Sequence, residues 1–416
     1  MKKRLAVLLA AAMTMSVATP VMAEEEVVVS LFNTKSEIQS LMEEKAAEYS
    51  EATEGVTVEV YFSNDTVAAH MATKYAAEDP YVLAMVDAKD IYSLGAEHAV
   101  DLSEEAWVAE TTQAIAIDGK TYGFPFCVEA RGIIYNADAI EAITGTEFVP
   151  ADYATLDAFQ GLIDTLIAGG MEAPVGIMKE DWSLGAHYLC QVFEMQEDAE
   201  AKVQAMYAGE GDLANDVVFN SLMDTFDVLK ANNYAKDSAI AAEREVTEQK
   251  LAEGEIAFMF GGNWDWAVIN AYDYTENMGI MPVPQNTEST ANTMLVGGGS
   301  KYFMIDNTKS EAEIQAAKDF LNWLVFDEAG QDFVVNTCAL VPAYANITLP
   351  VADPLGASVK AYADAGLMIP NYNYMPDDHY AVCGASFQKY LADQIDRAGF
   401  VSEIEGYWTA TTPVAH

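Results

Sequence analysis

The chain has 416 residues, which is too long for one ordinary hydrophobic core and suits two lobes. Hydrophobic residues make up 51% and charged residues 21%, so the composition excludes a disordered chain and is typical of a folded, soluble one. The 65 acidic and 21 basic residues give a net charge of −44, which phosphate backbones and anionic membranes repel. We therefore expect no nucleic-acid partner.

The N-terminus has the three parts of a signal peptide. Residues 2–4 are basic, and residues 5–18 form an apolar run that is too short to span a bilayer. Val21 and Ala23 place small residues where a signal peptidase requires them, and Glu24 begins an acidic segment. We predict a signal peptide over residues 1–23, cleaved after Ala23, and an exported mature protein.

Residues 27–87 alternate between strand and helix patterns. Strands are predicted at residues 27–32, 56–62 and 81–86, with a helix that begins near Ser36 and a second helix at 66–77 between them. This βαβαβ order predicts right-handed crossovers and a doubly wound α/β sheet. Such sheets bind ligands at the loops after their strands. Here those loops carry Asn33, Lys35 and Asp87.

The stretch DGKTYGFPFCVEARGIIYN, at residues 118–136, organises the rest of the chain. Large side chains alternate with small ones from Tyr122 to Val128, which is the period of a strand. Pro125 cannot donate a ladder hydrogen bond, which favours an edge or crossing strand over a central one. Glu129 stands alone among apolar residues. We predict a hinge strand with Glu129 facing the cleft that it spans.

The remaining chain is mainly helical. Helices are predicted from residue 156 to about residue 250 and again over residues 311–325. A strand at residues 255–260 runs into GGNWDW, and another at 302–305 follows a triple glycine that we expect to be flexible. The sequence shows neither an internal repeat nor a low-complexity linker. Two lobes without a linker imply that the chain crosses between them several times.

Motifs for catalysis, metals and cofactors are missing from the sequence. It contains no HExxH, GxSxG, Walker or GxGxxG motif, and its five histidines are scattered. The adjacent acids Glu180 and Asp181 could serve a glycosidase, but such pairs more commonly begin a helix. We expect no catalytic residue, no metal and no cofactor. The four cysteines form no CxxC pair, and their spacing leaves both disulfides and four buried thiols open.

Aromatic residues gather at the predicted ends of elements. Trp182 begins a helix, Trp264 follows a glycine pair, and Tyr374, His379 and Tyr380 crowd a loop near the C-terminus. Taken singly, a tryptophan is most often a core residue. Aromatic faces beside carboxylates and amides suit a sugar, which stacks its C–H face and bonds through its hydroxyls. A small cation such as a polyamine would use the same residues through cation–π contacts.

Four segments in this order resemble the extracellular solute-binding proteins of ATP-binding-cassette sugar importers, the family 1 class that includes maltose-binding protein. They are DGKTYGFPFCVEARGIIYN, FMFGGNWDW, AAKDFLNWLVFDEAGQ and DDHYAV, and the resemblance covers residues 26–409. It implies two α/β lobes joined by crossing hinge strands, with a ligand cleft between them. It also implies closure around the ligand without chemistry.

The resemblance assigns ligand contacts to particular residues. Glu129 and Asp87 correspond to carboxylates that bond sugar hydroxyls. Trp182 and Trp264 correspond to stacking aromatics, with Glu180 at the polar position of the turn before Trp182.

Further assignments concern the last segment and the first loop. His379 stands where maltose-binding protein has a third stacking tryptophan, and Tyr380 follows it. This departure implies a sugar other than maltose and leaves open which of His379, Tyr380 and Tyr374 contacts it. Asn33 and Lys35 are weaker candidates.

The resemblance also predicts organisation and partners. One lobe would comprise residues 24–128 and about 290–340, and the other about 129–289 and 341–416. We expect a monomer that hands a carbohydrate, an oligosaccharide in our reading, to the permease subunits of an importer. A polyamine-binding protein of the same fold and, less well supported, a secreted glycosidase are the alternatives. Because no cysteine precedes Cys127, we expect no lipid anchor and a periplasmic or extracellular location.

Overall fold

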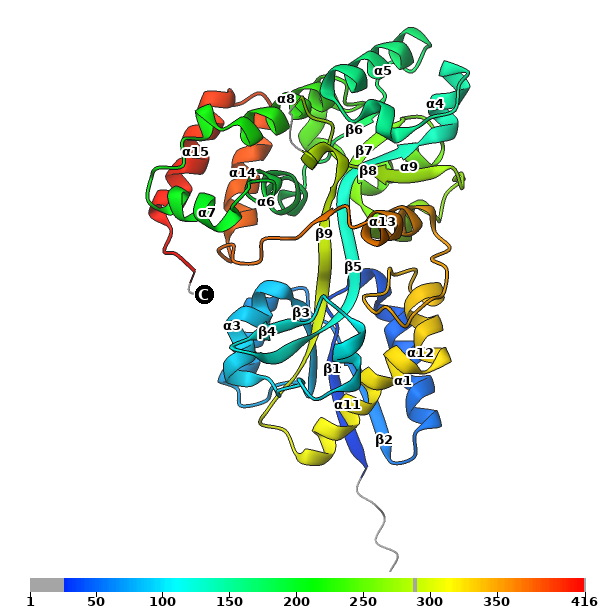
Figure 1. The fold of residues 1–416 in the computed structure, drawn as a ribbon, viewed down its shortest axis with the longest axis vertical. Coiled ribbons are helices and arrows are strands. Elements are labelled where there is room, and N and C mark those ends of the chain that lie inside the picture. Colours follow the sequence, from blue (N-terminus) through cyan, green and yellow to red (C-terminus); the bar gives the residue numbers. More distant parts are fainter. Residues whose placement is uncertain (1–25, 287–289, 415–416) are drawn as a thin grey trace, which may run out of the picture.

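The computed structural model describes residues 26–286 and 290–414. The predicted signal peptide at residues 1–23 lies outside the described residues. Figure 1 shows an elongated molecule whose elements gather in a lower and an upper part. Strands β5 (Lys120–Asn136) and β9 (Leu295–Ile305) run between the two parts.

The lower part contains the predicted βαβαβ unit. Strand β1 pairs in parallel with β2 on one side and β3 on the other, so the prediction of a doubly wound sheet is confirmed here. The elements of this part are β1 (Val27–Phe32), α1 (Gln39–Ala52), β2 (Val56–Tyr61), α2 (Val67–Ala76), β3 (Leu83–Asp87), α3 (Ala88–His98), β4 (Ile115–Ile117), α11 (Glu311–Phe326) and α12 (Glu328–Asp332). The first predicted helix begins as a 3-10 turn at Ser36–Ile38 and becomes α-helical only from Gln39.

The upper part is dominated by helices, as the sequence predicts for residues 156–250. Its helices are α4 (Ala137–Thr144), α5 (Leu156–Ala168), a π-helix (Trp182–Leu189), α6 (Gln191–Glu194), α7 (Ala199–Tyr207), α8 (Val217–Ala231), α9 (Arg244–Ala252), α10 (Trp266–Ile269), α13 (Pro354–Asp364), α14 (His379–Leu391) and α15 (Arg397–Ala410). Its strands are β6 (Val175–Gly176), β7 (Phe258–Gly262), β8 (Met278–Met281) and β10 (Met368–Ile369). The parallel pairing of β10 with β9 ties the end of α13 to the crossing strand.

Strand β5 crosses from the lower to the upper part, as predicted, but it is not an edge strand throughout. The sheet order is β2-β1-β3-β9-β5-β7-β6. Around Pro125, β5 pairs with β9, and the register shifts just after the proline, which accommodates its missing N–H. Beyond Arg131, β5 lies between β7 and β8, so the expectation of a non-central strand is wrong for that half.

The triple glycine is part of strand β9 and not a flexible connection. Gly297, Gly298 and Gly299 pair with Ala130, Glu129 and Val128 of β5. A Cβ atom at Gly297 would lie 2.3 Å from the Glu129 carbonyl oxygen, which no side chain tolerates. The glycines therefore allow two crossing strands to approach closely beside Glu129. In the sequence, this packing requirement gives the same run of glycines as a flexible turn would.

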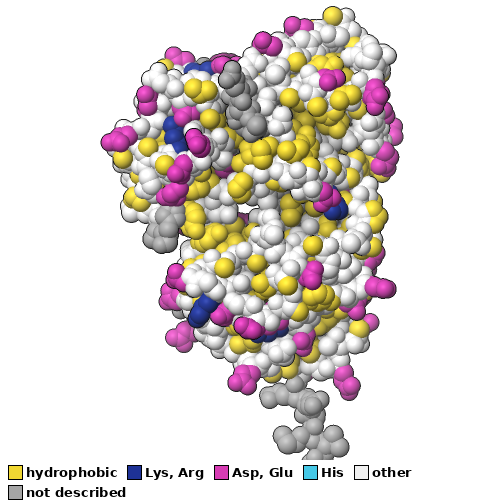
Figure 2. All heavy atoms as spheres, viewed as in Figure 1, with side chains coloured by type: hydrophobic (Ala, Val, Ile, Leu, Met, Phe, Trp, Pro, Cys, Tyr) yellow, Lys and Arg dark blue, Asp and Glu magenta, His cyan; other side chains and the backbone are white. Residues whose placement is uncertain are grey.

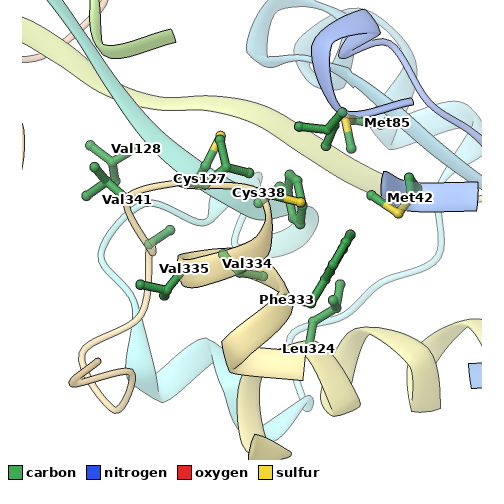
Figure 3. Close-up of a cluster of buried hydrophobic side chains, with 14 of the residues drawn as sticks. Met42, Met85, Cys127, Val128, Leu324, Phe333, Val334, Val335, Cys338 and Val341 are labelled. Atoms are coloured by element: carbon green, nitrogen blue, oxygen red, sulfur yellow. The ribbon is translucent and has the colours of Figure 1, made fainter. Parts of the chain in front are cut away.

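Buried apolar side chains fill both parts of the molecule. The largest cluster extends from β1 and α1 of the lower part to β7 and α13 of the upper part, so one side of the molecule is continuously packed. Figure 3 shows Cys127 and Cys338 within this cluster, among Met42, Met85 and Phe333. All four cysteines are buried and free, which confirms the alternative of four thiols.

Candidate ligand-binding site

A π-helix positions the first candidate residues. The helix begins at Trp182, whose N–H donates to Asp181 Oδ1 at 2.8 Å. It packs closely on α14, because a Cβ atom at Gly185 would lie 2.4 Å from the Tyr380 carbonyl oxygen, and one at Gly384 would lie 2.5 Å from that of Asp181. In a π-helix residues five apart follow one another on the same face, so Trp182 and His187 are neighbours.

Three aromatic rings form a row. The Trp182 and His187 ring centroids are 5.3 Å apart, and those of His187 and Trp264 are 4.7 Å apart. Trp264 lies in the turn that follows β7, and the Asn263 side chain anchors this turn by accepting the Ala130 N–H of β5 at 3.0 Å. All three residues are partly exposed. The row therefore lies beside the crossing strand and offers aromatic surface to solvent.

Arg244 lies over the ring of Trp182. Its guanidinium lies 4.6 Å from the Trp182 ring centroid, and its Nε and Nη2 atoms donate to the two carboxylate oxygens of Asp265, each at 2.8 Å. Glu180 Oε2 is 3.6 Å from Arg244 Nη1, longer than a hydrogen bond. Burial raises the pKa of Glu180, and Arg244 only partly offsets it. Burial and Asp265 raise the pKa of Glu248, which also contacts Arg244, to about 9.

We call Glu180, Trp182, His187, Arg244 and Trp264 the aromatic–arginine cluster. Four of its buried polar atoms have no hydrogen-bond partner: Glu180 Oε2, His187 Nδ1, Arg244 Nη1 and Trp264 Nε1. Burial, together with the nearby cations Arg131, Arg244 and Lys301, holds the pKa of His187 well below its usual value, so its imidazole is neutral. The cluster thus offers an acceptor, two donors and a neutral imidazole beside aromatic faces.

A second polar group lies where β1, β3, β5 and β9 meet. Lys35 Nζ is 2.5 Å from Glu129 Oε1 and 2.7 Å from Glu37 Oε1, and Lys301 Nζ is 2.5 Å from Asp87 Oδ1. Burial opposes the ionisation of Asp87, but Lys301 outweighs it and lowers the pKa of that carboxyl. We call Lys35, Glu37, Asp87, Glu129 and Lys301 the ion-pair group.

Asn33 shapes the loop that holds Lys35. Its side chain is fully buried, accepts the Lys35 N–H at 3.0 Å and donates to the Lys35 carbonyl oxygen at 2.9 Å. The amide is therefore occupied in organising the loop after β1, and it acts on the ion-pair group through Lys35.

The structure thus brings the predicted site residues together in two sets and separates His379 from both. Glu180, Trp182 and Trp264 share the aromatic–arginine cluster, while Lys35, Asp87 and Glu129 share the ion-pair group. The His379 ring is only 1% exposed and packs on Trp408 with centroids 5.3 Å apart, and burial lowers its pKa to about 4. Tyr380 is partly exposed on the turn of α14 that covers Gly185.

Sequence reasoning missed His187 and Arg244. His187 falls five residues after Trp182, a spacing that puts two side chains on different faces of an α-helix but on one face of a π-helix. Arg244 opens α9, where its charge looks like an ordinary exposed helix residue. Their only sequence signals are that His187 follows the flagged Trp182 by five residues and that Arg244 stands among the acids Glu243, Glu245 and Glu248.

Other kinds of site find little support. Within residues 26–286 and 290–414, no group of three or more His, Cys, Asp or Glu side chains is arranged to hold a metal ion. A mainly apolar cavity of about 340 Å³ is lined by residues that include Pro150, Met281, Tyr362 and Leu367, and it shares no residue with either polar set. Figure 2 shows a hollow at the waist, between the upper and lower parts.

The helices of the described part of the chain are all too short or too polar to cross a membrane.

Solved structures with the same fold are numerous. The SBP RafE in complex with raffinose is 19% identical, with a TM-score of 0.74 over 92% of this chain and 99% of that chain. A sugar transporter from Bacillus licheniformis in complex with stachyose is 18% identical, with a TM-score of 0.69 over 92% and 99%. A binding protein of an ABC transporter from Bifidobacterium animalis subsp. lactis, in complex with mannobiose, is 18% identical, with a TM-score of 0.67 over 92% and 94%.

At these identities the likeness shows the fold, which is the predicted periplasmic-binding-protein-like α/β architecture. A comparison with curated proteins finds no match. The sequence model of one protein family, described as Bacterial extracellular solute-binding protein, matches residues 44–366, well over half of the chain. Members of this family bind solutes outside the cell. The chain belongs to the bacterial extracellular solute-binding protein family.

Proposed function

We propose that this protein captures a carbohydrate, in particular an oligosaccharide, and delivers it to the permease of an ATP-binding-cassette importer. The observation that carries the proposal is the aromatic–arginine cluster, in which unpartnered polar atoms surround partly exposed aromatic rings. Raffinose, stachyose and mannobiose, bound by three proteins of the same fold, all present C–H faces and hydroxyl groups. The hydroxyl groups can bond to the unpartnered polar atoms of the cluster, and the C–H faces can stack on its aromatic rings.

Four residues of the cluster have distinct roles in the proposal. Trp264 stacks on the face of one sugar ring and its Nε1–H donates to a hydroxyl, while the open face of Trp182 contacts a second ring. Glu180 Oε2 accepts a hydroxyl proton and Arg244 Nη1 donates to a hydroxyl oxygen, so ligand binding supplies the hydrogen bonds that these buried atoms lack.

The ion-pair group closes the site from the lower part. Glu129 and Asp87 each have a lysine partner, yet a carboxylate has acceptor capacity for a sugar hydroxyl as well. The two lobes, with the boundaries predicted above, rotate about β5 and β9, and the ligand favours the closed form because it contacts both. The permease then recognises the closed form.

A neutral ligand fits this site better than a polyamine. Arg244 already occupies one face of Trp182, the position that a cationic ligand would take. Lys35 and Lys301 place two further cations in the ion-pair group. We propose binding without catalysis by a monomer, exported after cleavage at Ala23 and located in the periplasm or outside the cell.

A thermal-shift panel on the mature protein tests the proposal. The panel contains raffinose, stachyose, mannobiose, chitin oligosaccharides and glucose, with spermidine as the cationic probe. A ligand at a hundred times its dissociation constant adds about 2.7 kcal/mol, or roughly 3 °C for a chain of this size. We expect a rise with at least one oligosaccharide and none with spermidine. A rise with spermidine alone would overturn the ligand class, and release of reducing sugar would overturn binding without catalysis.

A further inference from the structure

Helix α3 of the lower part contacts the segment at residues 370–378 of the upper part. Lys89 Nζ of α3 is 2.8 Å from Asp377 Oδ1, and the Tyr92 ring centroid is 4.6 Å from that of Tyr374. Lys89 and Tyr92 are three residues apart on one face of α3, and Tyr374 and Asp377 have the same separation. The two contacts are therefore in register.

The segment at residues 370–378 is anchored to the upper part. The Tyr372 hydroxyl donates to Glu200 of α7 at 2.5 Å, and its N–H donates to Glu194 of α6 at 3.1 Å. At the other end of the segment, Asp378 Oδ1 accepts the hydroxyl of Tyr407 in α15 at 2.7 Å. A rigid rotation of the upper part would therefore carry the whole segment with it.

Helix α3 is anchored to the lower part in the same way. Ile91 is fully buried in a cluster with side chains of β1 and β3, and the Asp87 N–H at the start of the helix donates to Asp90 Oδ2 at 3.1 Å. Asp90 also holds Lys89, at 2.9 Å from its Nζ. Lys89 is thus held by a carboxylate of its own helix as well as by Asp377.

We propose that the Lys89–Asp377 ion pair and the Tyr92–Tyr374 ring contact form a latch that keeps the two parts together when no ligand is bound. The inference rests on the hinge motion of the proposed function. In Figure 1 the segment before α14 hangs from the upper part next to α3, while β5, β9 and the buried side chains around α13 join the two parts elsewhere. The latch is therefore the contact that must break for the molecule to open on this side.

The latch shifts the balance between closed and open forms without locking it. The Asp377 side chain is 73% exposed, and an exposed ion pair shifts such a balance by up to about fivefold. An aromatic pair adds up to about tenfold. A ligand with contacts in both parts can exceed these factors, so the latch presets the closed form and leaves ligand control intact.

Distances between spin labels measure the latch directly. Ala96 of α3 and Ala201 of α7 are exposed, one in each part, and the variant with both changed to Cys carries the labels. The four native cysteines are buried, which protects them from labelling. In ligand-free protein we expect a population at short distance beside one at longer distance, and we expect D377N to raise the ratio of the longer to the shorter population up to about fivefold. Adding Tyr374→Ala should increase it further.

Two comparisons make the result decisive. Glu403→Gln removes the same charge from an exposed pair with Lys389, inside the upper part, and should leave the distances unchanged. Salt at 1 M should mimic D377N in the parent and have little further effect on D377N, because the Debye length is then about 3 Å. Distances that stay the same in both latch variants, or a parent that is already open, would overturn the proposal.

The latch and the proposed function fail separately. The label measurement uses no sugar, so it remains valid if no member of the thermal-shift panel binds. If a sugar binds and the latch variants stay closed, the latch is wrong and the sugar-binding proposal stands.

Discussion

The ion-pair group and the aromatic–arginine cluster differ in whether their polar atoms already have partners within the protein. In the ion-pair group, every carboxylate has a lysine within 2.7 Å, and Asn33 fixes the backbone beneath Lys35. In the aromatic–arginine cluster, four buried polar atoms have no partner. Beside the ion-pair group, Thr34 has a buried hydroxyl that also has no hydrogen-bond partner. The upper set retains buried polar atoms without partners, and the charges of the lower set are all paired.

This difference teaches how binding is divided between the parts. Unpartnered buried groups are costly, so the free energy available from a ligand is concentrated in the upper cluster. Groups that are already paired must share their partners and contribute less. We therefore expect a sugar to bind the upper part first and the ion-pair group to contact it only on closure. Substitutions in the two sets should then differ in how strongly they reduce affinity.

Removal of the Trp264 ring should have the largest effect. Trp264→Ala removes a stacking face and the Nε1–H donor together, and we expect affinity for the sugar identified by the thermal-shift panel to fall more than a hundredfold. Isothermal titration calorimetry measures the change. Trp323→Ala on α11 is the matched control, because that ring packs on Tyr49 and Phe320 in the lower part. Similar losses in the two variants would show that the Trp264 effect is not local.

Neutralising Glu180 should have an intermediate effect. Glu180→Gln preserves shape but replaces a charged acceptor with a neutral one, and we expect roughly a tenfold loss of affinity. Stability at pH 7 should be maintained, because burial already disfavours the Glu180 carboxylate, as its raised pKa shows. Glu172→Gln, at an exposed position in the same stretch, controls for net charge. Unchanged affinity in Glu180→Gln would remove this carboxylate from the site.

A break in the ion-pair group should affect stability more than affinity. Lys35→Met leaves the buried Glu129 carboxylate without its lysine, and we expect the free energy of unfolding to fall by about 3 kcal/mol, with affinity changed by less than about threefold. Adding Glu129→Gln should recover part of the stability, because the more deeply buried charge is then removed and only Glu37, whose side chain is 31% exposed, is left without its lysine. Urea unfolding of the single and double variants measures this coupling. An affinity loss as large as that of Trp264→Ala would abolish the distinction between the two sets.

The sequence predicts the pieces of these sets better than their assembly. The order from β1 to β3 follows from hydrophobic periodicity and caps, which are local, and the predicted helix at residues 311–325 matches α11 within one residue. The prediction of a flexible triple glycine is wrong because closely packed strands and flexible turns both require glycine. His187 was missed as a neighbour of Trp182 because the π-helix departs from the 3.6-residue period of an α-helix.

The outcome for His379 has a different physical cause. The resemblance aligned it with a stacking position, but position along the chain does not determine which way a ring points. In the structure, α15 and α6 supply Trp408 and Phe193 as its neighbours, and these lie 29 and 186 residues away in the sequence. Long-range packing of this kind leaves no local pattern, so only the fold reveals that the ring is buried.

His379 therefore provides a test in which stability changes and affinity does not. Its pKa is lowered to about 4 by burial, whereas an unfolded histidine has a pKa of about 6.5. Between these values the unfolded chain binds more protons than the folded one, so stability is full above pH 6.5 and falls as the pH drops toward 4. Protonation of this histidine in the unfolded chain should lower the free energy of unfolding by roughly 3 kcal/mol over that pH range. In His379→Leu, urea unfolding from pH 7 to 4 should lack that component, while sugar affinity at pH 7 stays unchanged. A loss of affinity equal to that of Glu180→Gln would instead return His379 to the site, and an unaltered pH dependence would contradict its burial as a neutral ring.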